Sequence, residues 1–220
     1  MSITVALDTS TALTCVGVLP VDGPGVETFD VPSPGERPRH ATVALSLLSQ
    51  LLEEQNRSWG DITKFVVGIG PGSFTGIRVG IATALGVAEG VGAELVGVSG
   101  LTALLGGLEH GEQGSAMVDA RRGELYVAHS NDPLNPSCLP VDLTPASLGG
   151  PSTCLGDGAL LVRERLLELG FEVPEPDSPL HRISPLKMIE AERLGHGSSS
   201  LEPLYVREAD AIPTSERGAS

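Results

Sequence analysis

The chain has 220 residues and a mass of 22.7 kDa, which allows one large domain or two small ones. With 40% hydrophobic and 19% charged residues it can bury a core, and this composition excludes global disorder. The formal net charge is −14, so the chain lacks the basic stripe that binds nucleic acid directly, and an anionic membrane would repel it.

The first half of the chain predicts a mixed β-sheet with helices between its strands. Three short valine- and threonine-rich strands come first, separated by turn residues, at 3–7, 13–19 and 25–31. A leucine-rich helix is predicted at 41–54. Strands at 64–69 and 94–98 then alternate with helices at 74–90 and 101–108. Such alternation indicates that two parallel strands extend an antiparallel meander.

The second half predicts a smaller lobe. After a linker at 109–114, a hairpin is expected from strands 115–119 and 124–129, and helices are expected at 159–169 and 185–194. The stretch 198–200 and the C-terminal tail carry signals of mobility. We therefore expect a first lobe at 1–108, a second lobe at 109–207 and a mobile tail at 208–220.

A glycine-rich segment, Gly70-Pro-Gly-Ser-Phe-Thr-Gly76, joins a predicted buried strand to a helix. Free backbone N–H groups at a helix N-terminus favour anions, so the loop could cradle a phosphate. It matches neither a Walker A motif nor a dinucleotide-binding fingerprint. A tight turn with Ser73 as the N-cap is the preferred interpretation.

Small residues recur every four positions in the helix that follows. They are Gly72, Gly76, Gly80, Ala84 and Ala88. A smooth face of this kind requires a closely packed neighbour. The helices at 41–54 and 74–88 are both apolar on more than the side that one sheet can cover. We expect them to bind another protein chain, and packing on each other alone is the alternative.

The residues of this expected interface come from both helices and from the loop before the second one. They are Leu45, Leu48, Leu52, Gly72, Phe74, Gly76, Ile77, Gly80, Ala84 and Ala88.

Neither a metal site nor a catalytic centre is expected. His40 could begin a His-x-x-x-His metal pair, but position 44 is alanine, so His40 is predicted to be an ordinary exposed residue. Gly97-Val-Ser99-Gly-Leu101 resembles a hydrolase elbow without its second glycine, and Ser99 is better explained as a helix N-cap.

Three polar residues at predicted turns are weak candidates for nucleotide binding: Asp8, Ser10 and Asp119. As turn formers they need no ligand.

The three cysteines lack CxxC spacing and leave an odd thiol, which favours a reducing compartment. The N-terminus lacks the basic region of a signal peptide, and no apolar run is expected to reach membrane-spanning length. A cytoplasmic location is expected.

Several motifs resemble the TsaB (YeaZ) family, most strongly over residues 1–130. The motifs are Val5-Ala-Leu-Asp-Thr-Ser10, His40-Ala-Thr, Gly68-Ile-Gly-Pro-Gly-Ser-Phe-Thr-Gly-Ile-Arg-Val-Gly80, Val98-Ser99 with Leu101, Asp119-Ala-Arg-Arg-Gly-Glu124 with Tyr126, and Pro203-Leu-Tyr-Val-Arg207. The resemblance implies an α/β fold of the actin-like, Hsp70-like ATPase class, with two ribonuclease-H-like lobes of mixed sheets and an abbreviated second lobe.

The resemblance also implies a function. TsaB-like proteins help to install threonylcarbamoyl on the adenosine beside the tRNA anticodon, whereas the transfer itself belongs to the paralogue TsaD. The chain is therefore expected to be a non-catalytic activator that forms a homodimer alone and a heterodimer with TsaD. The same resemblance implies that a TsaE-type ATPase binds the heterodimer and that tRNA is contacted only indirectly.

Ser10 stands where the fold's phosphate motif has glycine, and Arg121-Arg122 occupies the second phosphate turn. The chain is accordingly expected to have no intrinsic cofactor, with ATP or ADP bound only weakly or at a shared interface. The alternatives are a glycoprotease-like peptidase and a nucleotide-binding, kinase-like enzyme of the same fold.

Overall fold

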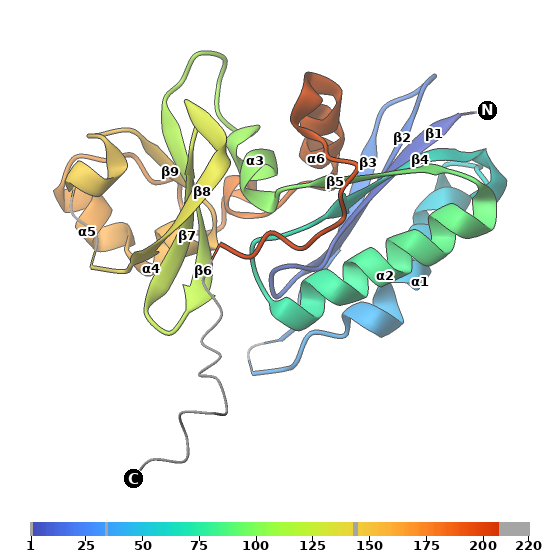
Figure 1. Ribbon diagram of the computed structural model, residues 1–220, viewed down its shortest axis with the longest axis horizontal. Coiled ribbons are helices and arrows are strands. Elements are labelled where there is room, and N and C mark those ends of the chain that lie inside the picture. Colours follow the sequence, from blue (N-terminus) through green and yellow to red (C-terminus); the bar gives the residue numbers. More distant parts are fainter. Residues whose placement is uncertain (1, 34, 143–144, 207–220) are drawn as a thin grey trace, which may run out of the picture.

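The computed structural model describes residues 2–33, 35–142 and 145–206, which fold into two lobes around two β-sheets (Figure 1). The predicted mobile tail and Arg207 of the last motif lie outside the described residues.

The first sheet has the strand order β3-β2-β1-β4-β5. Strands β1 (Ile3–Asp8), β2 (Thr14–Pro20) and β3 (Val26–Asp30) form the expected antiparallel meander. Strands β4 (Ile62–Gly68) and β5 (Glu94–Val98) run parallel to β1. The five-stranded mixed sheet predicted from the sequence is confirmed.

One face of this sheet is covered by α1 (His40–Glu54) and α2 (Phe74–Val91), which lie together in Figure 1. Leucines of α1 and alanines of α2 share a core with the strands. The short turn η1 (Trp59–Asp61) leads from α1 into β4.

The second sheet repeats this topology in shorter form, with the order β8-β7-β6-β9. The meander consists of β6 (Gly114–Arg121), β7 (Glu124–His129) and β8 (Asp132–Pro140), and β9 (Thr153–Leu155) pairs in parallel with β6. Strands β8 and β9 were not predicted.

Short helical segments complete the second lobe. They are η2 (Pro145–Leu148), α4 (Asp157–Leu161), α5 (Arg163–Glu168) and η3 (Pro179–His181). The single helix predicted at 159–169 is divided at Val162, whose φ of −120° and ψ of 16° are not helical.

Two helices lie between the sheets: α3 (Gly100–Leu105) and α6 (Pro185–Ala191), the latter followed by the single turn η4 (Glu192–His196). Met188 and Ile189 of α6 share a core with Ala6 and Val66 of the first sheet. Although α6 falls within the predicted range of the second lobe, it therefore packs on the sheet of the first.

The chain then returns along the open edge of β5. Gly97 and Ser198 exchange two backbone hydrogen bonds of 2.8 and 2.9 Å, and Leu204 N–H donates to the Ile69 carbonyl at 2.8 Å. The prediction that the stretch 198–200 is mobile is wrong, because its backbone pairs with the sheet.

Candidate functional site

The small residues of α2 pack against the end of β1 and the turn after it. A Cβ atom at Gly76 would overlap the Thr9 carbonyl oxygen, and one at Gly80 would lie 2.5 Å from Thr9 Oγ1. Thr9 Oγ1 donates to the Gly76 carbonyl at 2.7 Å. The close neighbour of this row is therefore the turn after β1 and not another chain, as its place in the expected interface required, because the missing side chains let α2 approach its own lobe.

The structure divides the expected interface residues into buried and exposed groups. The buried residues are Leu48, Leu52, Gly76, Ile77, Gly80, Ala84 and Ala88, and they form part of the lobe interior. Gly72 is half-buried, and only Leu45 and Phe74 are exposed. The seven buried residues cannot contact a partner directly, whereas a partner surface on α1 and α2 stays a prediction.

The solvent side of α2 nevertheless carries an apolar face. Phe74 is 55% exposed and Leu85 is 42% exposed, and Ala82 and Gly86 of the same helix are exposed as well. Leu45 of α1 is 46% exposed. The spacing of the α2 residues places them on one side of the helix, away from the buried row.

An aromatic and cationic cluster stands at the N-terminal end of this face. The rings of Phe74 and Tyr205 stack with their centroids 5.9 Å apart, and the Arg78 guanidinium lies 3.7 Å from the centre of the Phe74 ring. Arg78 Nη2 also donates to the Tyr205 hydroxyl at 3.4 Å. Tyr205 comes from the segment that returns along the edge of β5, so the C-terminal part of the chain extends the surface of α2.

The glycine-rich loop is bound into the lobe. Ser73 Oγ accepts from Gly76 N–H at 3.2 Å, so Ser73 is the N-cap of α2 as predicted. Ser73 N–H donates to the Ser10 carbonyl at 2.7 Å, and the Gly70 carbonyl accepts from Gly100 N–H at 2.9 Å. The geometry favours the tight turn over the phosphate cradle.

Asp8 is a buried carboxylic acid rather than an open ligand. Its Oδ1 accepts from Ser10 N–H and Ser10 Oγ, each at 2.9 Å, while Oδ2 faces Gly68 and has no hydrogen-bond partner among the described residues. Burial raises the pKa of Asp8 to about 6. The two hydrogen bonds from Ser10 lower this pKa, but by less than burial raises it. Ser10 is also buried.

Asp119 lies at the corresponding turn of the second lobe. Its carboxylate pairs with Arg121 at 2.9 Å, and its backbone N–H donates to Asp157 Oδ1 at 3.2 Å. Burial raises the pKa of Asp157. A cavity of about 30 Å³ lies beside Asp157, between Cys15 of the first sheet and Val118 of the second. It is far smaller than the roughly 300–1,000 Å³ of ligand pockets.

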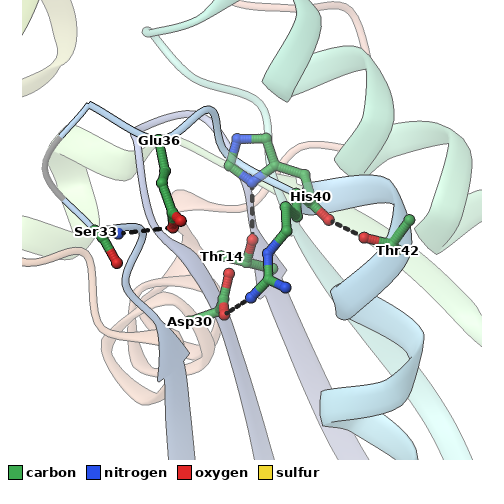
Figure 2. A network of polar contacts seen from close by, with 7 residues as sticks. Thr14, Asp30, Ser33, Glu36, His40 and Thr42 are labelled. Carbon is green, nitrogen blue, oxygen red and sulfur yellow. Dashed lines mark hydrogen bonds and ion pairs between the residues drawn. The ribbon is translucent and has the colours of Figure 1, made fainter.

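His40 is buried, not exposed as predicted. A hydrogen bond of 2.8 Å joins its Nδ1 to Thr14 Oγ1 of β2, and the residue is 8% exposed (Figure 2). Burial lowers the pKa of His40. Arg39 beside it reaches Asp30 of β3 at 3.2 Å. The histidine therefore joins the start of α1 to the first sheet.

Neither metal ligation nor an activated serine is supported by the surroundings of these residues. Within the described ranges, no group of three His, Cys, Asp or Glu side chains is placed to hold a metal ion. Ser99 occupies the N-cap position of α3, but its side chain makes no capping hydrogen bond. The predicted N-cap position is therefore confirmed, but Ser99 Oγ is buried and has no partner among the described residues.

By length and composition, α2 is apolar enough to cross a membrane, contrary to the sequence expectation. In the structure it covers the first sheet and buries its small-residue row there. It is thus a helix of the lobe's own core.

A family model described as TsaD, tRNA N6-adenosine threonylcarbamoyltransferase, matches residues 31–135. The TsaB protein of Escherichia coli, named for tRNA threonylcarbamoyladenosine biosynthesis, is 37% identical over 92 residues, 40% of each chain. An uncharacterized protein of Mycobacterium leprae is 30% identical over 217 residues, 97% of this chain and 57% of that protein. The YeaZ structure from Pseudomonas aeruginosa superposes with a TM-score of 0.72 at 23% identity, covering 93% of this chain and all of that one.

Proposed function

The chain belongs to the TsaB/YeaZ family, and from this membership we propose that it is a non-catalytic partner subunit in the modification of tRNA with threonylcarbamoyl. The chain is TsaB-like and linked to threonylcarbamoyladenosine biosynthesis. In the proposal, it activates a TsaD-type paralogue by binding it through α1 and α2. A TsaE-type ATPase then binds the heterodimer, and alone the chain forms a homodimer.

The observation that carries the proposal is the exposed face of α2 with its Phe74–Arg78–Tyr205 cluster. Aromatic residues and arginine are enriched among the residues that dominate binding energies at protein interfaces. Here Phe74 stacks on Tyr205 and Arg78 lies over its ring, and the exposed Leu85 lies on the same side of α2. A TsaD-type partner of the same fold class could present an equivalent pair of helices, which suits a pseudo-symmetric contact.

Two further features support a non-catalytic role. The cavity bounded by Cys15 and Val118 has a volume of about 30 Å³, which is too small for a nucleotide. Asp8 is buried and accepts hydrogen bonds from Ser10. The net charge of −14 also disfavours direct binding of tRNA. Substrate and nucleotide would then be bound by the partner subunits.

Light scattering coupled to size-exclusion chromatography tests the proposal, with this chain mixed with the TsaD-type protein of the same cell. Phe74→Glu and Leu85→Glu introduce charge at exposed positions of α2, so both variants should fold and lose the heterodimer. Leu134→Glu is the matched control, because Leu134 is 56% exposed on β8 of the other lobe.

A heterodimer that forms equally well with all three variants would refute the proposed interface. In a tRNA modification assay with the TsaD-type protein and the other proteins of the pathway, the wild-type chain and Leu134→Glu should support modification. Phe74→Glu and Leu85→Glu should not. Modification that does not depend on this chain would refute the activator role.

A further inference from the structure

A groove runs along the second lobe beside α5 and β9. It has a volume of about 1010 Å³ and is closed on the other side by the connection between α3 and β6. In Figure 1, α5 lies at the end of the molecule opposite to α1 and α2. The groove is therefore separate from the proposed contact surface of α2.

The floor of this groove is apolar. Leu155 of β9 and the buried residues Phe171 and Val173 lie beneath it. Leu167 of α5 is 42% exposed and lines the groove, while its neighbour Leu166 is buried in the core of the lobe. Exposed apolar surface inside a groove is typical of a site where another molecule binds.

The rim of the groove is acidic. Its ionisable lining residues are Glu109, Glu112, Glu172, Glu175 and Arg163. Arg163 pairs with Glu175 at 3.2 Å, and Glu112 accepts from the backbone N–H of Glu109 at 2.8 Å. The side chains of Glu109 and Glu172 are exposed at the mouth. Four acids against one base leave this rim with an excess of negative charge.

This arrangement selects among classes of ligand. Nucleic acid would be repelled by the rim. A metal ion needs clustered ligands, whereas no three of the described acidic, histidine and cysteine side chains are grouped to hold one. The volume is at the upper end of the range for small-molecule pockets, which leaves room for a length of polypeptide.

We propose that the groove binds a cationic amphipathic helix of another protein. The leucine side of such a helix would cover Leu167 and its neighbours, and its lysine or arginine side chains would meet Glu109 and Glu172. Amphipathic helices bind apolar grooves in this way, and complementary charge at the rim speeds and directs the encounter. This surface is a second docking site, which leaves α2 available for the partner proposed above.

Fluorescence anisotropy tests the inference with a labelled helical peptide that has leucine on one side and lysine on its flanks. The full-length wild-type chain should bind it, and a peptide with glutamate in place of lysine should not bind. The double variant Glu109→Lys with Glu172→Lys should bind the lysine peptide about tenfold more weakly. The matched control is Glu164→Lys with Glu168→Lys, which changes the net charge equally on exposed positions of α5 outside the groove.

A second pair of variants tests the apolar floor. Leu167→Ser should weaken peptide binding about threefold or more, whereas Leu161→Ser, at an exposed leucine outside the groove, should not. Circular dichroism checks that each variant is folded. Equal weakening by the groove and control variants, equal binding of the two peptides, or absence of binding would each overturn the proposal. The heterodimer assay is independent of these outcomes, so failure of this inference leaves the α2 interface untouched.

Discussion

Replacing Gly76 by alanine measures how closely α2 packs on β1. The new methyl group would overlap the Thr9 carbonyl oxygen, which is backbone and cannot move aside like a flexible side chain. Overpacking of this kind costs roughly 1–3 kcal/mol. Movement of the helix would also break the 2.7 Å hydrogen bond from Thr9 Oγ1 to the Gly76 carbonyl, worth about 1 kcal/mol.

The higher helix preference of alanine opposes these costs by up to about 1 kcal/mol. We therefore expect Gly76→Ala to lower the free energy of unfolding by about 2 kcal/mol. Gly86 provides the matched control on the same helix, because it is exposed and a Cβ there would meet no atom within 4 Å. Gly86→Ala should raise the free energy of unfolding by about 0.5–1 kcal/mol.

Urea unfolding followed by circular dichroism at 25 °C measures both variants against the wild type. The two substitutions are chemically identical, so the expected difference of about 3 kcal/mol comes from their surroundings. If Gly76→Ala were as stable as Gly86→Ala, the row would not be packed on Thr9. The row would then be available to contact another chain, as its spacing predicts.

Further predictions concern buried polar groups of the first lobe. Thr14→Val should lower the free energy of unfolding by about 1–3 kcal/mol, because it leaves His40 Nδ1 buried without a partner, whereas Thr14→Ser should be milder in the same urea assay. The pKa of His40 should lie below 6.5 in an NMR titration, and a pKa above 6.5 would contradict its burial. Because the unfolded state then binds a proton more readily than the folded state, the contribution of His40 to stability should decline as the pH falls below 6.5. Burial raises the pKa of Asp8 from 3.8 to about 6, so between these values the folded state holds a proton that the unfolded state releases. Stability should therefore fall by about 2 kcal/mol from pH 4 to pH 6. Asp8→Asn should remove this component of the pH dependence, and an unchanged slope would show that another group causes it.

Most elements of the first lobe could be predicted because their apolar periodicities are long and bounded by turn residues. The strands missed in the second lobe lack those signals. Strand β8 contains Pro133, Pro136 and Pro140, which usually argue against a strand, but as an edge strand it needs partners on one side only. Strand β9 has three residues, too few for an alternating pattern to appear.

The candidate site was harder to predict because periodicity identifies a face without identifying its neighbour. The row from Gly76 to Ala88 indicates close packing whether that neighbour is another chain or Thr9 of the same lobe. The Phe74–Arg78–Tyr205 cluster joins residues 127 positions apart, so the spacing of α2 alone could not reveal it. The burial of His40 likewise depends on Thr14, which comes from another element.

The place of α6 affects how the chain can fold during synthesis. The ribosome completes β5 at residue 98, but Met188 and Ile189, which cover Ala6 and Val66 of the same sheet, emerge only after the whole second sheet. Until then, part of an apolar sheet face is open to solvent, a state that favours aggregation or chaperone binding. A fragment that ends between the lobes would keep this sheet face exposed, because α6 completes the lobe that is synthesised first.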